Sequence, residues 1–278
     1  MAFQNFKIRT TITVLGIPTL AAITLFTTWT FAIFFTIAGG LVLREMFDAM
    51  RKHDLSPNTV LGYAIYLAMV MIIVGSTLEY LVTLLILSII GLFIVELFRK
   101  EQRVFENLSI TFFAVVYTAL VMGSFIQTRG LNIPGFSGWG NFGGRLMLTI
   151  FLAVWICDML AYLVGSAIGK HKIFPRVSPN KSWEGSVAGL LGAILTVYVL
   201  AATPFIPQLG WIDILALGVI AGGFGQVGDF AESLVKRDVA IKDSSNLIPG
   251  HGGAWDRLDS LFFAVPLSYL YIKTFFLV

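Results

Sequence analysis

The stretch LEYLVTLLILSIIGLFIVELF, residues 78–98, decides the class of fold. It is an apolar run of about 20 residues, the length of a helix that crosses a bilayer. The same character extends over all 278 residues, of which 57% are hydrophobic and only 13% are charged. A soluble domain carries roughly 25% charged residues. The sequence therefore predicts an all-α, polytopic integral membrane protein.

Apolar runs of spanning length predict about nine transmembrane helices, because helices of about 20 residues with realistic loops fill a chain of this size. The boundary between the first two rests on a short polar patch that contains Thr27, Thr28 and Thr30. The first run is too long for a signal peptide and has no small-residue cleavage site, so we interpret it as a retained helix. The predicted helices are 11–27, 28–46, 59–75, 78–98, 106–126, 145–169, 185–204, 211–228 and 258–277.

The basic residues predict the orientation of the chain. With the N-terminus in the cytosol, all of the 19 Lys and Arg fall in cytosolic segments except Arg129, Arg145 and Lys273. Positive residues gather on the cytosolic side of membrane proteins. We therefore expect a multi-pass protein of the plasma (inner) membrane, with its N-terminus in the cytosol and its C-terminus outside.

No internal repeat or low-complexity linker divides the chain, so residues 1–278 are interpreted as one polytopic membrane domain. Residues 1–144 are expected to be scaffold helices and residues 145–278 the catalytic half. Within the scaffold, the charged hairpin from Glu45 to Asp54 is most simply a solvated loop. The cytosolic loops that carry motifs are 170–184 and 229–257.

Acidic residues mark the most informative segment, because a carboxylate near a bilayer is costly unless it is paired, hydrated or bound to a cation. Six of the 16 Asp and Glu lie between residues 229 and 259. If the eighth helix continues past residue 228, four polar side chains share one of its faces. The glycines before them would admit a close neighbour or break the helix at membrane depth. A charged cap that ends the helix in water is the alternative. The four side chains are Asp229, Glu232, Ser233 and Lys236.

Asp256 and Asp259 also share a helical face, at the start of the ninth predicted helix. Such carboxylates suit Mg²⁺, which joins one or two carboxylates to substrate phosphates. Pairing with a helix dipole would explain one aspartate, but it does not explain two that flank Arg257. These residues are therefore candidates for a metal site.

A glycine turn precedes these aspartates. Successive backbone N–H groups around His251, Gly252 and Gly253 would form an anion-binding nest. Lys242 and Arg257 add positive charge suited to phosphate. His251 is either a hydrogen-bond donor to phosphate or a turn residue, since no second His or Cys lies near it for a zinc site.

A further cluster runs from the sixth predicted helix into its loop. Asp158 lies within an apolar run, and an ionisable residue there is a functional candidate by default. Tyr162, Gly165 and Gly169 follow on the same stripe, where the glycines equally suit close helix packing.

The polar stretch SPNKSWEG, residues 178–185, opens the seventh predicted helix. Ser182 is placed to cap that helix. Lys181 is placed to join the cytosolic site. The loop therefore supplies either a structural cap or part of the same phosphate-binding region.

These motifs resemble a known family. The segments SLVKR (233–237), KD (242–243) and IPGHGGAWDRLD (248–259) are similar to the signature of the bacterial phosphatidate cytidylyltransferases, the CDP-diacylglycerol synthases. SPNKSWEG and the Asp158 stripe also resemble that family, so the likeness covers residues 155–262. Ala254 departs from the larger aliphatic residue expected there, which concerns local packing.

The resemblance implies conversion of CTP and phosphatidic acid into CDP-diacylglycerol and pyrophosphate, a step of phospholipid biosynthesis. It implies Mg²⁺ as cofactor and leaves open a second metal ion. A lipid phosphate is largely ionised at neutral pH, so the reaction needs charge neutralisation rather than a general base. The implied partners are CTP, phosphatidic acid and membrane lipid, without nucleic acid, and a homodimer is reasonable. Both motif loops fall on the cytosolic side, where CTP is found.

Chemistry and resemblance together assign roles. Asp229 and Asp256 are expected to bind metal, with Asp259 as a further ligand. Lys236 and His251 complete the expected catalytic set. Asp158 and Asp259 are expected to support the site. Substrate binding is expected from Lys181, Ser182, Ser233, Arg237, Lys242, Gly252, Gly253 and Arg257.

Two other functions fit parts of the sequence. An ion-coupled transporter would use the intramembrane Asp158 and a broken eighth helix, but no inverted repeat is visible. Another CDP-lipid phosphotransferase would also use membrane aspartates, yet the Asp-Gly and Ala-Arg pattern of that class is missing. Both therefore rank below the nucleotidyltransferase.

Overall fold

The computed structural model of the chain describes residues 2–77, 79–133, 136, 140–245, 247 and 252–277, with side chains from Val14 onward. Its regular elements are all helical over these residues, and no strand is assigned among them. This confirms the all-α class. The elements are α1 (Ala2–Phe26), α2 (Thr28–Arg51), α3 (Thr59–Val74), α4 (Glu79–Phe98), α5 (Val104–Gly130), α6 (Phe142–Ile168), α7 (Trp183–Ala201), α8 (Trp211–Val219), the π-helical turn η1 (Ile220–Phe224), α9 (Gly225–Asp238), α10 (Trp255–Leu258), α11 (Leu261–Tyr271) and η2 (Ile272–Phe276).

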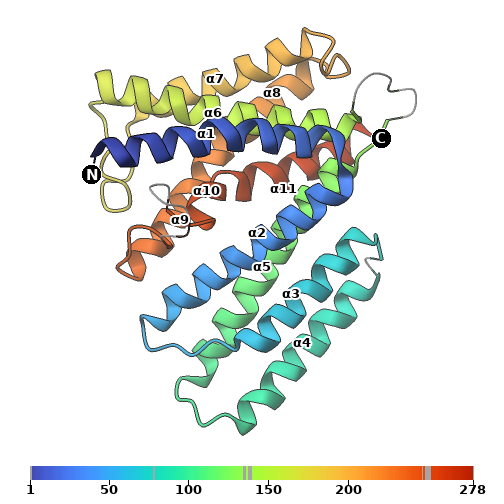
Figure 1. Cartoon of the computed structure of the whole chain (residues 1–278), viewed down its shortest axis with the longest axis vertical. Coiled ribbons are helices and arrows are strands. Elements are labelled where there is room, and N and C mark those ends of the chain that lie inside the picture. The colour runs from blue at the N-terminus through green and yellow to red at the C-terminus, as the bar shows by residue number, and fades with distance from the viewer. Residues whose placement is uncertain are drawn as a thin grey trace.

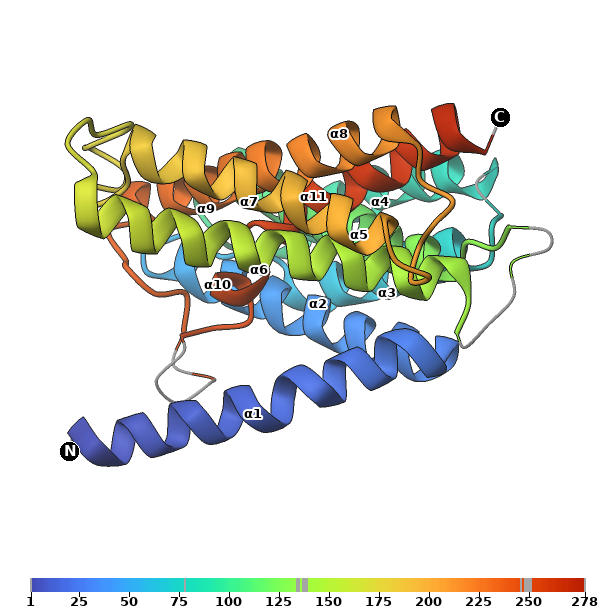
Figure 2. The same ribbon diagram turned by 90° about the horizontal axis from the view of Figure 1, so that it is seen from above.

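Every predicted run overlaps one of these helical segments. By length and apolar composition, six helical segments of the described chain are able to cross a membrane, and shorter apolar helices accompany them. The two ends of the chain lie at opposite ends of the bundle (Figure 2). The six are Thr28–Arg51, Glu79–Phe98, Val104–Gly130, Phe142–Ile168, Trp183–Ala201 and Trp211–Asp238. The total of nine and the sidedness stay predictions.

The first two helices separate at Thr27, as the polar patch predicts. Thr27 has extended backbone angles, φ −132° and ψ 110°, between the end of α1 and the start of α2. The chain reverses there, so that α2 runs back along the bundle while α1 lies on its outer side (Figures 1 and 2).

The eighth helix continues past residue 228, because α8, η1 and α9 form one continuous segment through Asp238, and this meets the condition for the predicted shared polar face. The glycines do not break it. At Gly222, within η1, a Cβ would lie 2.9 Å from Leu190 Cα of α7. The glycine therefore admits a close neighbour, and the π-helical turn takes up the local change of pitch. A broken helix, which the transporter interpretation required, is absent from the described segment.

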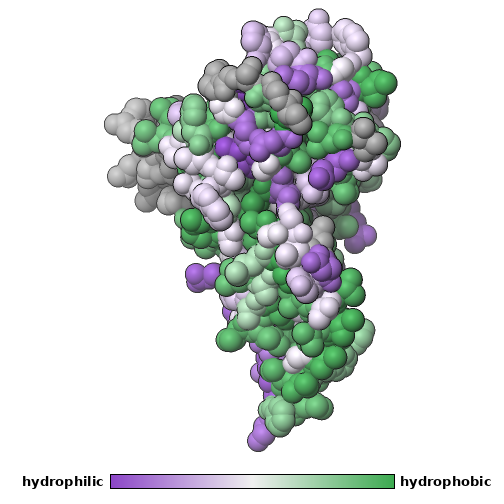
Figure 3. All heavy atoms as spheres, turned by 90° about the vertical axis from the view of Figure 1, so that its right-hand side faces the viewer, coloured by the Kyte–Doolittle hydropathy of each residue, from purple (hydrophilic) through white to green (hydrophobic). Residues whose placement is uncertain are grey.

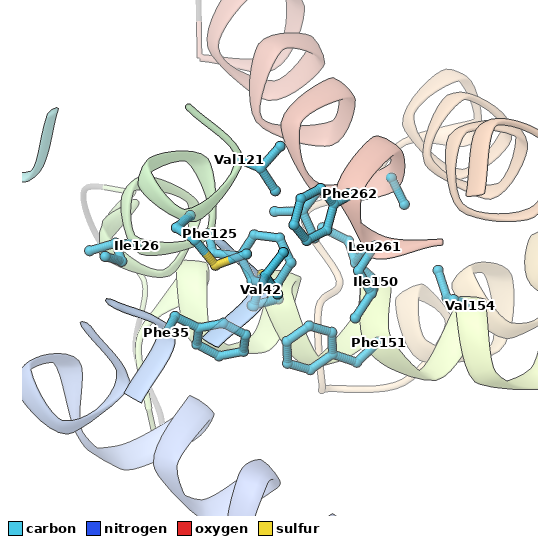
Figure 4. Close-up of a cluster of buried hydrophobic side chains, with 14 of the residues drawn as sticks. Phe35, Val42, Val121, Phe125, Ile126, Ile150, Phe151, Val154, Leu261 and Phe262 are labelled. Carbon is cyan, nitrogen blue, oxygen red and sulfur yellow. The ribbon is translucent and has the colours of Figure 1, made fainter. Parts of the chain in front are cut away.

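A buried aromatic cluster joins α2, α5, α6 and α11 (Figure 4). Phe35 and Phe125 have ring centroids 4.8 Å apart, and Phe151 lies 6.1 Å from Phe35. Lipid tails are as apolar as these rings, so the cluster stabilises the bundle mainly through van der Waals packing. Phe262 belongs to the same cluster, so α11, the helix that follows α10, packs against the rest of the bundle there.

The outer surface of α3 and α4 is apolar (Figure 3). Val60, Met71 and Val82 are among the large apolar side chains exposed there, with Val60 exposing 82% of its surface. Water would make such a surface unfavourable. A lipid environment accounts for it and agrees with the membrane class predicted from composition.

Candidate active site

A cavity of about 690 Å³ lies between α6, the loop before α7, α9 and the start of α10. It brings together the three clusters that the sequence places far apart. The Asp158 stripe lines it from α6, through Tyr162, Gly165 and Gly169. The other predicted site residues that line the cavity are Lys181, Ser182, Asp229, Asp256, Arg257 and Asp259.

Three carboxylates meet at this cavity. Each of Asp229, Glu232 and Asp259 offers an oxygen, and these oxygens lie within 4.8 Å of one another. Asp229 and Glu232 lie one turn apart on α9, which confirms the predicted shared face. Gly228 brings Asp259 close, since a Cβ there would lie 2.7 Å from the Asp259 carbonyl oxygen. The arrangement is suited to a small hard cation.

Glu232 is the member of this cluster that the predicted ligand set omits. Its carboxylate is buried, and its Oε1 accepts no hydrogen bond from the described residues. A buried carboxylate of this kind is costly unless a cation compensates it. The i, i+3 spacing from Asp229 is the sequence signal that identifies it.

Two lysines partly neutralise the acidic cluster. Lys236 is buried, and its Nζ lies 2.7 Å from both Glu232 Oε2 and Asp256 Oδ1. Lys181 pairs with Asp229, and its Nζ lies 4.4 Å from the centroid of the Phe230 ring. Among the described residues Asp259 has no ion-pair partner, which leaves one carboxylate of the cluster for a bound cation.

Asp256 lies beside this cluster and has a different environment. Its Oδ2 accepts hydrogen bonds from Gly253 N at 2.8 Å and Ser244 N at 3.0 Å, and Ser244 Oγ lies 3.0 Å from the same oxygen. Burial raises the pKa of Asp256, but these bonds and Lys236 outweigh it and lower the pKa below its ordinary value. Asp256 is therefore held ionised. Its assignment as a metal ligand stays a prediction.

The phosphate-binding nest predicted around His251, Gly252 and Gly253 stays a prediction, and the N–H groups of residues 253–255 donate to carboxylates of the protein itself. Gly253 N donates to Asp256, while Ala254 N and Trp255 N donate to Glu45 at 2.9 Å each. Gly252 has φ +81°, a left-handed conformation that favours glycine. A Cβ on it would also lie 2.5 Å from Asp256 Oδ2. His251 lies outside the described residues.

Glu45 is the residue of this region that sequence reasoning missed. Residues 45–51 belong to α2 rather than to the predicted loop. The predicted solvent exposure holds for Asp48 and Arg51, whose side chains are 45% and 47% exposed. It is wrong for Glu45, which is 4% exposed. The sequence signal was its apolar neighbours Leu43 and Met46, which are also buried on α2.

The SPNKSWEG loop folds over the end of α6. Ser182 caps α7 by accepting from Gly185 N at 3.3 Å, which confirms the structural alternative, while its role in substrate binding stays a prediction. Gly165 lies against this turn, because a Cβ there would lie 3.5 Å from Gly185 Cα. His171 Nδ1 lies 2.6 Å from Glu184 Oε1, so an ion pair or hydrogen bond also ties the two ends of the loop together. The stripe glycines thus serve packing.

Three predicted substrate-binding residues, Ser233, Arg237 and Lys242, are not among the residues that line the cavity. Ser233 Oγ donates to Asp229 Oδ1 at 3.4 Å. Arg237 is exposed and donates to the carbonyl of Ile241 at 2.9 Å. Lys242 and Arg257 are exposed, and the Asp158 side chain is also accessible within the cavity.

Comparison with known proteins shows which family the chain belongs to. A sequence model described as the cytidylyltransferase family matches residues 7–275. The phosphatidate cytidylyltransferase of Bacillus subtilis is 34% identical over 178 residues, 63% of this chain and 62% of the relative. That of Haemophilus influenzae is 42% identical over 130 residues, 45% of each chain. The chain thus spans less than two thirds of the length of these curated relatives. The match of the family model along nearly the whole chain shows that this protein belongs to the cytidylyltransferase family.

Proposed function

We propose that the chain is a phosphatidate cytidylyltransferase, which makes CDP-diacylglycerol and pyrophosphate from CTP and phosphatidic acid. In this reaction a phosphate oxygen of the lipid forms a bond to the α-phosphorus of CTP. The bond from that phosphorus to the oxygen bridging to the β-phosphate breaks, and pyrophosphate leaves with the electron pair. The curated relatives named above carry this activity in their names.

The observation that carries the proposal is the cluster of Asp229, Glu232 and Asp259, of which Asp229 and Asp259 line a cavity that also has basic and apolar walls. The donor set fits Mg²⁺, which takes carboxylate oxygens and several waters and joins them to phosphates. When bound, Mg²⁺ supplies charge neutralisation for the phosphates. These three carboxylates would hold it.

The other cavity residues suit two anionic substrates. Lys181 and Arg257 line the cavity and supply positive charge for phosphate groups. Trp155 and Tyr162 line its α6 wall, where an apolar surface suits the part of a lipid next to its phosphate. Lys236 is already paired with Glu232 and Asp256, so its role is to orient these carboxylates.

We further propose that the cavity faces the cytosol at the plasma (inner) membrane. The basic residues of the sequence support this orientation, because Lys172, Lys181 and Arg257 line the cavity and belong to the segments predicted to be cytosolic. CTP would then reach the site from water while phosphatidic acid reaches it from the bilayer.

The test is direct. Purified protein in detergent is incubated with CTP, phosphatidic acid and Mg²⁺, and lipid products are separated and identified. CDP-diacylglycerol is expected, and it should be absent without phosphatidic acid or with a chelator. Folded protein that forms no CDP-diacylglycerol under these conditions would contradict the proposal.

A further inference from the structure

Glu45 joins the N-terminal helices to the loop that precedes Asp256. Its Oε1 accepts from Ser245 Oγ at 2.6 Å and from Ala254 N at 2.9 Å. Its Oε2 accepts from Ser244 Oγ at 2.8 Å and from Trp255 N at 2.9 Å. These partners lie 199 to 210 positions away in the sequence. Each carboxylate oxygen therefore receives one hydroxyl and one backbone donor from the same loop.

The same loop segment holds Asp256. Ser244 Oγ lies 2.8 Å from Glu45 Oε2 and 3.0 Å from Asp256 Oδ2, so it stands between the two carboxylates. Ser244 N donates to Asp256 as well. Ala254 and Trp255, whose N–H groups Glu45 accepts, come directly before Asp256 in the chain. Glu45 thus holds Ser244 and Ser245 as well as Ala254 and Trp255, the two residues that come just before Asp256.

Gly253 is required by this contact. A Cβ at residue 253 would lie 2.5 Å from both carboxylate oxygens of Glu45 and would also overlap Ser244 Oγ. Real Cβ atoms essentially never approach that closely. The second glycine of the motif therefore leaves room for Glu45, in addition to providing the N–H group that reaches Asp256.

We propose that Glu45 is a positioning residue for cytidylyl transfer, which acts by fixing residues 244–245 and 254–255 and so the orientation of Asp256 and of Lys236 paired with it. This inference rests on the proposed function. Glu45 touches no substrate in this account. It acts through the loop, and its loss should impair the transition state more than the binding of CTP, because misorientation of reacting groups costs rate.

Glu45→Gln removes the charge with little change of shape. Wherever the new amide nitrogen lies, it faces either Ala254 N–H or Trp255 N–H, so two donors oppose each other and at least one backbone hydrogen bond is lost. Removal of a residue that orients a metal or catalytic group commonly costs about 10- to 100-fold in activity or metal affinity. We expect kcat to fall by that factor, with the KM for CTP within about threefold of the wild type.

Glu96→Gln is the matched control. Glu96 is also a buried glutamate of the N-terminal helices, and it pairs with Arg99 rather than with the loop. Its replacement should leave kcat within about twofold of the wild type. Hydrogen exchange of peptides covering residues 244–258 gives a readout that does not depend on turnover, and it should be faster in Glu45→Gln and unchanged in Glu96→Gln.

Both variants and the wild type are measured for kcat, KM, fraction folded and exchange of this segment. A lower kcat per folded molecule with faster local exchange in Glu45→Gln alone supports the proposal. Wild-type kcat in folded Glu45→Gln, or unchanged exchange, overturns it. A wild type that makes no CDP-diacylglycerol refutes the proposed function and with it the role in transfer, whereas exchange alone then decides whether Glu45 fixes the loop.

Discussion

Lys236→Met tests whether a buried ammonium group stabilises the two carboxylates that it contacts in the site. The lysine side chain is 9% exposed and pairs with Glu232 and Asp256, whose side chains are 2% and 6% exposed. Methionine keeps the length and apolar stem of lysine but removes its charge. Two buried carboxylates then lose their cationic partner, and breaking a buried pair in this way costs about 3–5 kcal/mol of folding free energy.

Lys181→Met is the comparison. Lys181 pairs with Asp229, but the two side chains are 30% and 24% exposed. Solvent screens that pair, so its loss should cost about 1 kcal/mol or less. The two variants remove the same charge from the same cavity and differ mainly in burial. Unfolding in detergent, followed by a helix signal against denaturant, should therefore separate them by about 2–4 kcal/mol.

Mg²⁺ provides the second readout for the same variant. Lys236 and a bound cation compete for Glu232, since both neutralise its carboxylate. Removal of Lys236 leaves more uncompensated negative charge, so Mg²⁺ should stabilise Lys236→Met more than it stabilises the wild type. Equal stability of the two lysine variants, together with equal Mg²⁺ stabilisation of Lys236→Met and wild type, would refute this reasoning.

Three further predictions concern neighbouring residues. Asp256→Asn should lower turnover about 100-fold or more with the fold retained, because it loses the charge that Lys236 and the loop donors orient; near-normal turnover would remove Asp256 from the reaction. Gly253→Ala should destabilise the protein by about 1–3 kcal/mol through overlap with Glu45, measured by thermal unfolding, and unchanged stability would contradict the close approach. A cysteine in place of Leu247, which is 48% exposed, should react with an impermeant thiol reagent only when the cytosolic side is open, and labelling from outside would reverse the orientation.

Hydropathy predicted most of the fold because each spanning helix must be apolar along its whole length. The polar patch at Thr27 likewise predicted the break between α1 and α2. Hydropathy left open whether the eighth helix continues to Asp238, because α9 is largely polar and a hydropathy window ends where it begins. A polar helix that is stabilised by packing against its neighbours gives no hydropathy signal.

The candidate site was predictable where its residues lie close in sequence. The helical spacing of Asp229 and Lys236 placed them on one face, and the motif stretch gave Asp256 and Asp259. Glu45 could not be found in this way, because its partners lie about 200 positions later and only the folded chain brings them together.

The central claim is transfer of the cytidylyl group, and two labels on CTP test it most directly. Purified protein is supplied with phosphatidic acid and Mg²⁺, and with CTP labelled either at the α-phosphate or at the γ-phosphate. We expect the α-label in the lipid product and an equal amount of γ-label in soluble pyrophosphate. Lipid that carries the γ-label, or lipid without any label from folded protein, would contradict the account.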